Sequence, residues 1–274
     1  MTVIHNKHVL VTGGASGIGR LVALRCGELG ATVTIWDLDA AGAEEAAAEA
    51  AARGAGGAHA FACDVSDREQ VYAVAREVRD EAGDVDILIN NAGVVSGRTL
   101  LDLPDESIER TFAVNTLALF WTAKAFLPAM VARGSGHIVN VASAAGLIGT
   151  PKETDYAASK FAVIGFNESL RQELRRSAPG VKTTVVCPFY VDTGMFAGVK
   201  TRIPLLLPIL KEEDVAAQII AAVQHDRPQV QMPAMVRTLP MMRMLPVWAF
   251  DRLADFFGVN DAMNDFSGRR TTAS

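Results

Sequence analysis

Short β-rich runs alternate with helix-like segments along the first 190 residues, and this alternation restricts the possible folds more than any other feature. The strands are nearly continuous apolar runs, which is typical of parallel strands buried on both faces. The expected strands are His8–Thr12, Thr32–Asp37, Ala58–Val65, Asp86–Asn90, His137–Ser143 and Lys182–Pro188. The expected helices cover residues 17–30, 40–54, 67–82, 105–133 and 154–177. The pattern predicts a doubly wound α/β fold around a parallel sheet.

Composition limits the class of protein further. The chain has 274 residues, of which 50% are apolar, so we expect a single domain with a large core. A net charge of −5 without basic runs argues against a nucleic-acid partner. Three separated cysteines indicate reduced thiols, and five scattered histidines predict no metal site. We also expect no secretory signal, so a cytoplasmic location.

One segment, Phe112–Val131, is apolar enough to need comparison with a membrane span. Asn115 and Lys124 interrupt it, and such side chains are costly in hydrocarbon. A long buried helix is therefore the expected structure.

A glycine-rich turn, T-G-G-A-S-G-I-G at Thr12–Gly19, follows the first expected strand and precedes a helix. Gly13 allows a tight turn, Gly17 lets the backbone approach a pyrophosphate, and Gly19 permits close helix–strand packing. The helix N-terminus then offers free amide donors to phosphate. A merely flexible turn is the alternative, but the strand before it and the helix after it favour a dinucleotide site of Rossmann type.

Asp37 closes the second expected strand, 18 residues after Gly19. Its carboxylate can accept hydrogen bonds from ribose hydroxyls and repels a 2′-phosphate. Leu38 follows it, and Gly13–Gly17 contains no Lys or Arg. The expected cofactor is therefore NAD rather than NADP, although Asp37 could instead cap the next turn.

Three further motifs carry a family resemblance. N-N-A-G stands at Asn90–Gly93, Y-A-A-S-K at Tyr156–Lys160, and Ser143 lies thirteen residues before Tyr156. With the T-G-x-x-x-G-x-G turn, they make the chain resemble the short-chain dehydrogenase/reductase family over residues 8–200 and beyond.

The closest branch looks like the retinol dehydrogenases and 17β-hydroxysteroid dehydrogenases. The segments that carry this likeness are Trp36–Asp39, Phe120–Met130, Gly136–Gly146 and Val186–Phe196. The family often has Pro-Gly after the sixth strand, whereas this chain has Pro188-Phe189, so we expect a difference in the shape of that loop rather than in cofactor binding.

The catalytic prediction rests on side chains one helical turn apart. Tyr156 and Lys160 project from one helix face, and a nearby ammonium favours phenolate, making the Tyr a usable general base. Ser143 would hydrogen-bond the substrate oxygen. The resemblance adds that Lys160 holds the nicotinamide ribose and that Asn115 keeps a helix kink and a water in a proton relay. Each residue also has a purely structural interpretation: Ser143 as a turn residue, Asn115 as a polar break in a core helix, and Lys160 as a solvated side chain.

The resemblance also places the cofactor. Asp64 and Val65 should meet the adenine, although Asp64 could equally cap the next helix. The full set of expected cofactor contacts is Gly13, Ala15, Ser16, Gly17, Ile18, Gly19, Asp37, Asp64, Val65, Asn91, Ala92, Gly93, Tyr156, Lys160, Val191 and Thr193.

The last part of the chain, residues 191–274, has a different composition and is expected to form a lid and extension on a core of residues 1–190. Ile203–Leu210 reads I-P-L-L-L-P-I-L, and Met232–Phe257 combines Met, Leu, Trp and Phe with three arginines. Three interpretations of the second segment stay open: a lid packed on the core, contact with a membrane surface, and an oligomer interface.

The sequence thus predicts an NAD-dependent oxidoreductase for a hydroxyl/carbonyl pair on a small lipophilic substrate. An NADPH-dependent ketoreductase is one alternative, and a non-catalytic NAD-binding regulatory protein is another. The resemblance implies a homodimer or homotetramer through the helices at 105–133 and 154–177. It leaves two locations open, free in the cytoplasm or peripheral at a membrane.

Overall fold

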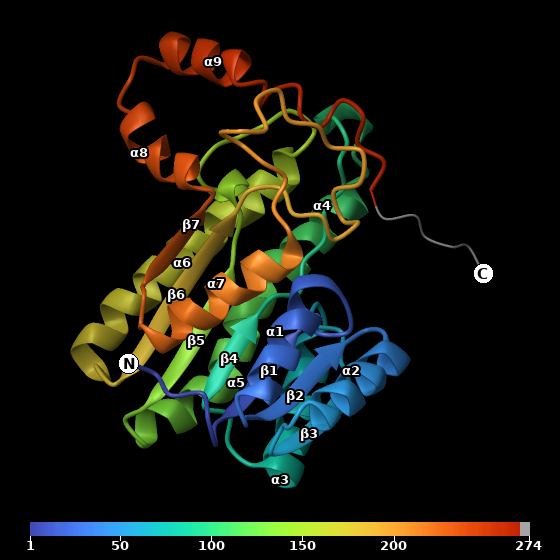
Figure 1. Ribbon diagram of the computed structural model, residues 1–274, viewed down its shortest axis with the longest axis vertical. Coiled ribbons are helices and arrows are strands. Elements are labelled where there is room, and N and C mark those ends of the chain that lie inside the picture. The colour runs from blue at the N-terminus through green and yellow to red at the C-terminus, as the bar shows by residue number, and fades with distance from the viewer. Residues whose placement is uncertain (269–274) are drawn as a thin grey trace.

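Seven parallel strands form one sheet in the computed structural model, which describes residues 1–268 (Figure 1). Their order is β3-β2-β1-β4-β5-β6-β7, so the winding direction reverses between β1 and β4. A ligand crevice is expected at the carboxyl ends of the strands at that point. The strands are β1 His8–Thr12, β2 Thr32–Asp37, β3 Gly57–Ala62, β4 Ile87–Asn90, β5 Gly136–Val141, β6 Val181–Pro188 and β7 Gln229–Met232.

Helices cover both faces of this sheet. They are α1 Gly17–Glu28, α2 Ala40–Ala52, α3 Arg68–Ala82, α4 Asp105–Phe112, α5 Ala118–Ala132, α6 Thr154–Ser177, α7 Glu212–Gln224, α8 Leu239–Met242 and α9 Val247–Phe256. In Figure 1, α1, α2 and α7 lie on the near face. The helices α3, α5 and α6 pack on the other.

The core explains why the strands are apolar on both faces. Along β1, Val9 and Val11 point to the α1–α2–α7 side while Leu10 points to the α3–α5–α6 side, and all three are 0% exposed. This confirms the expected doubly wound parallel sheet. The three cysteines are also buried, and burial raises the pKa of each thiol to about 12.

Several elements differ from the sequence expectation. The third strand ends at Ala62 rather than Val65, because the Asp64 side chain accepts hydrogen bonds from Ser66 N and Oγ and closes a turn. Asp67, rather than Asp64, caps α3. The expected helix 105–133 is interrupted by a π-helical segment, Ala113–Leu117, which contains Asn115, the residue at which the resemblance implied a kink. The short edge strand β7 was not predicted.

The stretch Asp105–Ala132 is the one described segment whose length and composition would suit a membrane span, and half of its most apolar window is buried inside the protein. Its helices pack against α3 and α6.

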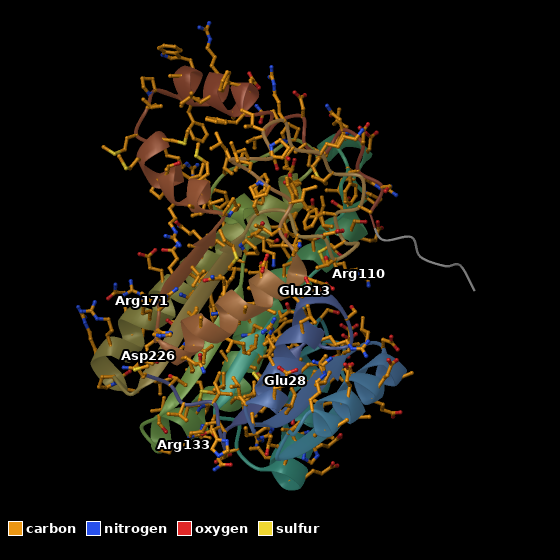
Figure 2. All side chains as sticks on the ribbon, viewed as in Figure 1. Glu28, Arg110, Arg133, Arg171, Glu213 and Asp226 are labelled. Atoms are coloured by element: carbon orange, nitrogen blue, oxygen red, sulfur yellow. The ribbon has the colours of Figure 1, made fainter. Side chains whose placement is uncertain are left out.

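The two ends of the sheet differ in what surrounds them. At the carboxyl ends, α8, α9 and the loops around them form a separate lobe (Figure 1). Figure 2 shows Glu28 and Arg133 at the far end of the molecule from that lobe, and Arg110 nearer to it. Arg133 lies 3.4 Å from Asp86 in one of the ion pairs at the far end. The cleft lies at the carboxyl ends of the strands.

Candidate active site

A cleft of about 300 Å³ runs along the carboxyl ends of β1 to β6. All the expected site residues line it except Ala15, Gly19 and Asn115. Residues that the sequence did not single out for the site also face it, among them Arg110, Val114, Pro188 and Met195. The fold therefore brings segments 180 residues apart in the chain to one cavity.

The glycine turn is fastened by backbone contacts. Gly13 has a φ of +65° and donates its N–H to Trp36 O at 2.7 Å. The amide of Asn91 donates to the carbonyls of Thr12 and Gly13, both at 3.0 Å. A Cβ at Gly19 would lie 2.1 Å from Gly13 O, so this glycine shapes the turn from behind rather than lining the cleft.

The turn leads directly into α1, which begins at Gly17 with a φ of +56°. Ser16, Gly17 and Ile18, at the start of this helix, line the cleft, and the first turn of a helix has backbone amides without intrahelical acceptors. A narrow glycine cradle in front of a helix N-terminus fits a pyrophosphate, because side chains there would keep the anion away from the amides.

Asp37 lies at the other side of the turn, at the end of β2. Its Oδ2 accepts the N–H of Ala15 at 3.0 Å and its Oδ1 accepts the N–H of Asp39 at 3.1 Å. Ala15 thus supports the carboxylate instead of lining the cleft. A separate residue, Asp39, caps α2 by accepting from Gly42 N, whereas the Asp37 side chain caps the turn before that helix through the N–H of Asp39, as the alternative interpretation expected.

Ser143, Tyr156 and Lys160 gather at the inner end of the cleft, each at most 8% exposed. Lys160 Nζ donates to Val141 O at 2.9 Å and lies 5.6 Å from the centre of the Tyr156 ring. Ser143 Oγ accepts from Ala145 N at 3.1 Å and donates to Pro188 O at 3.4 Å. The hydroxyl, phenol and ammonium are therefore held together in the wall of the cleft, each largely buried.

Burial governs the electrostatics of this cluster. Burial lowers the pKa of Lys160 to about 8 and raises the pKa of Tyr156. The Glu153 carboxyl raises the pKa of Tyr156 further, and the hydrogen bond with Ser143 lowers it. The sequence argument expected the ammonium to lower the tyrosine pKa. The opposite direction arises because desolvation of the phenolate outweighs an ammonium that is itself buried and bonded to a carbonyl.

Asn115 lies beneath the cleft floor, in the π-helical segment. Its Oδ1 accepts from Val94 N at 2.9 Å, and its Nδ2 donates to Val94 O and to Ser159 Oγ, both at 3.0 Å. A Cβ added to Gly93 would lie 3.4 Å from Asn115 Oδ1 and 3.6 Å from Lys160 Nζ. The side chain thus ties the loop after β4 to α6, and the irregular helix turn provides the room for it.

Sequence reasoning missed the polar groups packed around the start of α6. Asp155 accepts from Ser96 Oγ and Thr111 Oγ1, both at 2.8 Å, and Glu153 is 1% exposed. The signal was the pair of acidic residues three positions and one position before Tyr156. Nothing in the local pattern showed that they would be buried.

An apolar pocket of about 50 Å³ adjoins the cluster on the side of the C-terminal lobe. Phe189 belongs to both cavities, and Ala144 follows Ser143 directly. The pocket is lined by Ala144, Ile148, Phe189, Leu207, Met235, Val236, Leu239, Met242, Phe250, Leu253, Ala254, Phe257 and Val259. No charged side chain lines it among the described residues.

Comparison with known proteins agrees with this geometry. The sequence profile of the short chain dehydrogenase family matches residues 7–203. The chain belongs to the short-chain dehydrogenase family. It is 46% identical to epidermal retinol dehydrogenase 2 of Mus musculus over 264 residues, which cover 96% of this chain and 85% of the relative.

Solved structures of the family superimpose on the fold. A short-chain dehydrogenase from Burkholderia phymatum, in complex with NAD, matches with a TM-score of 0.80 and 29% identity over 89% of this chain and 95% of that one. A metagenomic short-chain oxidoreductase in complex with NADP matches with a TM-score of 0.69 and 29% identity, covering 84% of this chain and 96% of that one. This short-chain dehydrogenase is therefore an oxidoreductase of a family that uses NAD or NADP.

Proposed function

We propose that this short-chain dehydrogenase interconverts a hydroxyl and a carbonyl on a lipophilic substrate with NAD, using Tyr156 as general acid and base. The observation that carries the proposal is the buried Ser143–Tyr156–Lys160 cluster between the glycine-lined cleft and an apolar pocket. The names of similar proteins point to a retinoid as one substrate of this class.

Different residues of the chain have different roles in the proposed reaction. When bound, the nicotinamide accepts the hydride in oxidation and donates it in reduction. Tyr156 Oη takes the hydroxyl proton of the alcohol, or returns a proton to the carbonyl oxygen in the reverse direction. Ser143 Oγ holds the substrate oxygen, and Lys160 and Asn115 fix the floor beneath the nicotinamide ribose.

The two ends of the cofactor are part of the same proposal. We propose that Asp64 and Val65, which line the cleft after β3, meet the adenine, that Asn91, Ala92 and Gly93 after β4 pass beneath the adenosine ribose, and that Val191 and Thr193 reach the nicotinamide. We propose that residues 1–190 form the cofactor-binding and catalytic part and residues 191–274 the substrate cover, of which residues 269–274 lie outside the described structure.

Replacing Tyr156 by Phe tests the central proposal. Turnover of retinol with NAD should fall by about 10²–10⁴-fold, because a positioned acid–base group is removed. NAD binding, measured by calorimetry, should persist. Tyr72→Phe on α3 is the matched control and should keep wild-type turnover. Equal turnover by both variants would refute the role of Tyr156.

Asp37 favours NAD over NADP in this proposal. Both of its oxygens are fixed by backbone amides, so its negative charge stays at the cleft, where it would repel a 2′-phosphate. Arg20, a nearby cation on α1, is paired with Glu45 and Glu49. Initial rates with both cofactors test this, and Asp37→Asn should raise the NADP/NAD ratio of kcat/KM by about tenfold or more. Asp39→Asn is the matched control, and a wild-type preference for NADP would overturn the assignment.

The apolar pocket supports a lipophilic substrate, although its volume in this structure is large enough for only a few methylene groups. A larger apolar group would need α8 and α9 to move outward. Turnover of retinol, a steroid alcohol and 1-decanol should exceed turnover of lactate. The reverse order would contradict this substrate class.

Two surfaces bear on location and assembly. The outer side of α8 and α9 exposes Met241, Met244 and Trp248, and we propose that it contacts a membrane surface at the cytoplasmic side.

The outer side of α5 and α6 exposes Phe120 and Phe161, and we propose that it is the contact surface of a homodimer or homotetramer. Light scattering of the wild type and of Phe120→Ser would test the second surface, since the variant should be smaller.

A further inference from the structure

Glu153 is a buried acidic residue that the proposed reaction does not use. It stands at the N-cap of α6, three residues before Tyr156, and is 1% exposed. Its side chain makes no capping hydrogen bond to the helix, so helix capping does not explain it. No ion pair involves it within the described chain, and the adjacent Lys152 instead donates to Met263 O and Asn264 O, both at 3.3 Å.

The contacts of this carboxyl are few and neutral. Oε2 accepts hydrogen bonds from Thr150 Oγ1 and, at 3.3 Å, from the Tyr190 hydroxyl. Oε1 is buried without a hydrogen-bond partner. An ionised carboxylate in this place loses its water and gains two hydroxyl donors, which compensate only part of the loss.

Aromatic rings connect this carboxyl to the catalytic tyrosine. The Tyr190 ring packs edge-on against Phe196 at 5.2 Å, and Phe196 packs in the same way against Tyr156 at 5.7 Å. Glu153, Tyr190 and Tyr156 are each at most 6% exposed, and the partly buried Phe196 ring lies between the two tyrosine rings, so the four side chains form one contiguous cluster. A charge change at one end acts on the other with little screening.

Burial raises the pKa of Glu153 to about 7, so its charge changes in the neutral range. The ionised form raises the pKa of Tyr156. Ser143 and Lys160 also face Tyr156, from the end of β5 and from α6, while Asp155 and Thr150 face Glu153 and Tyr190 faces both.

We propose that Glu153 is a positioning residue whose negative charge adds to the effect of burial in holding Tyr156 in the neutral phenol form, which favours carbonyl reduction over alcohol oxidation at neutral and alkaline pH. This rests on the proposed role of Tyr156. The phenol is the proton donor needed for reduction, whereas phenolate is the base needed for oxidation.

The test is the pH profile of kcat/KM for retinol oxidation at saturating NAD. In Glu153→Gln the neutral amide replaces the charge at nearly the same size, so the rise of oxidation with pH should move about 0.5 pH unit or more to lower pH. At a pH on that rising limb, oxidation should then increase about threefold or more. Glu168→Gln on the exposed side of α6 removes the same charge from the same helix and should keep the wild-type profile.

A second pair of variants separates charge from packing. Glu153→Asp and Glu153→Asn have the same shortened length, and only the first keeps the charge. The Asn profile should lie at lower pH than the Asp profile by about 0.5 pH unit or more. A smaller difference, or one in the opposite direction, would overturn the proposal even if Glu153→Gln does not fold.

The two proposals fail in different ways. If Tyr156→Phe abolishes turnover while the Glu153 variants keep the wild-type profile, only the role of Glu153 is wrong. If Tyr156→Phe keeps turnover, the proposed function itself is wrong.

Discussion

The cofactor region, residues 1–190, and the C-terminal region, residues 191–268, are built in opposite ways. Strand side chains such as Val9 and Leu88 in the cofactor region are 0% exposed, and a Cβ added at Gly13 or Gly19 of its glycine turn would lie within 3 Å of backbone atoms. The C-terminal region leaves Met244, Val247 and Trp248 at least 65% exposed and encloses a small apolar pocket. A site for an invariant cofactor can be rigid, while a site for flexible apolar substrates benefits from side chains that repack.

The largest effect is expected at the glycine turn. Gly19→Ala places a Cβ 2.1 Å from Gly13 O and 2.5 Å from Asn91 Nδ2. Relief would require the turn to move, so we expect loss of NAD binding and a decrease of about 3 kcal/mol in the free energy of unfolding. Urea unfolding and calorimetry measure the two effects.

Gly165→Ala is the control, because within one copy of the chain its Cβ would meet nothing within 4 Å on α6. It should keep NAD binding and gain about 0.5–1 kcal/mol, since alanine stabilises a helix interior. Similar behaviour of the two variants would remove the contrast between a packed turn and an open helix face.

The parts of the fold that the sequence predicts correctly are those fixed by local interactions, and the parts that it misses depend on residues far apart in the chain. β1 and β2 begin and end where expected, because their apolar pattern and the flanking glycines are local signals. The π-helical turn at Asn115 depends on partners 21 and 44 residues away, Val94 and Ser159. β7 has only four residues and exists through its pairing with β6. These features have no local pattern that announces them.

The same difference between local and long-range interactions applies to the candidate site. The motif spacing placed Ser143, Tyr156 and Lys160 correctly in one cavity. It could not show the direction of the Tyr156 pKa, because that depends on burial by Phe196 and on the Glu153 charge. Long-range packing therefore limits what the sequence reveals about chemistry.

A matched pair of leucines compares packing in the two regions. Leu88→Ala in β4 should cost about 3 kcal/mol, because its side chain is 0% exposed and leaves a cavity. Leu253→Ala in α9 should cost about 1 kcal/mol, because that side chain is only partly buried. The second variant should instead raise the KM for retinol while leaving the KM for NAD unchanged. Equal losses of stability would show that the lobe is packed as tightly as the sheet.

Acid should destabilise the cofactor region first. His137 in β5 is 0% exposed and bonded to Thr184 Oγ1 at 2.8 Å, and burial lowers its pKa to about 4. The unfolded chain binds a proton at this site below about pH 6.5, whereas the folded chain resists it, so stability falls between pH 6.5 and 4. We expect a loss on the order of 2 kcal/mol from this residue. His137→Gln should flatten the urea-unfolding curve against pH in that range, and an unchanged slope would exclude His137 as a cause.

The smallest effect on stability is expected on the outer face of the lobe. Met244 and Trp248 are 85% and 65% exposed, and Arg252 lies 5.6 Å from the centre of the Trp248 ring. Met244→Ser with Trp248→Ser should change the unfolding free energy by less than about 0.5 kcal/mol, because neither side chain is packed in the core. The same double variant should bind vesicles of phosphatidylcholine and phosphatidylserine at least several-fold more weakly in a sedimentation assay, since the two side chains and the neighbouring arginine suit an interface of apolar chains and anionic headgroups. If wild type and variant sediment equally, the exposed face of α8 and α9 has another role, and a smaller oligomer in the variant would identify it as a contact between copies of the chain.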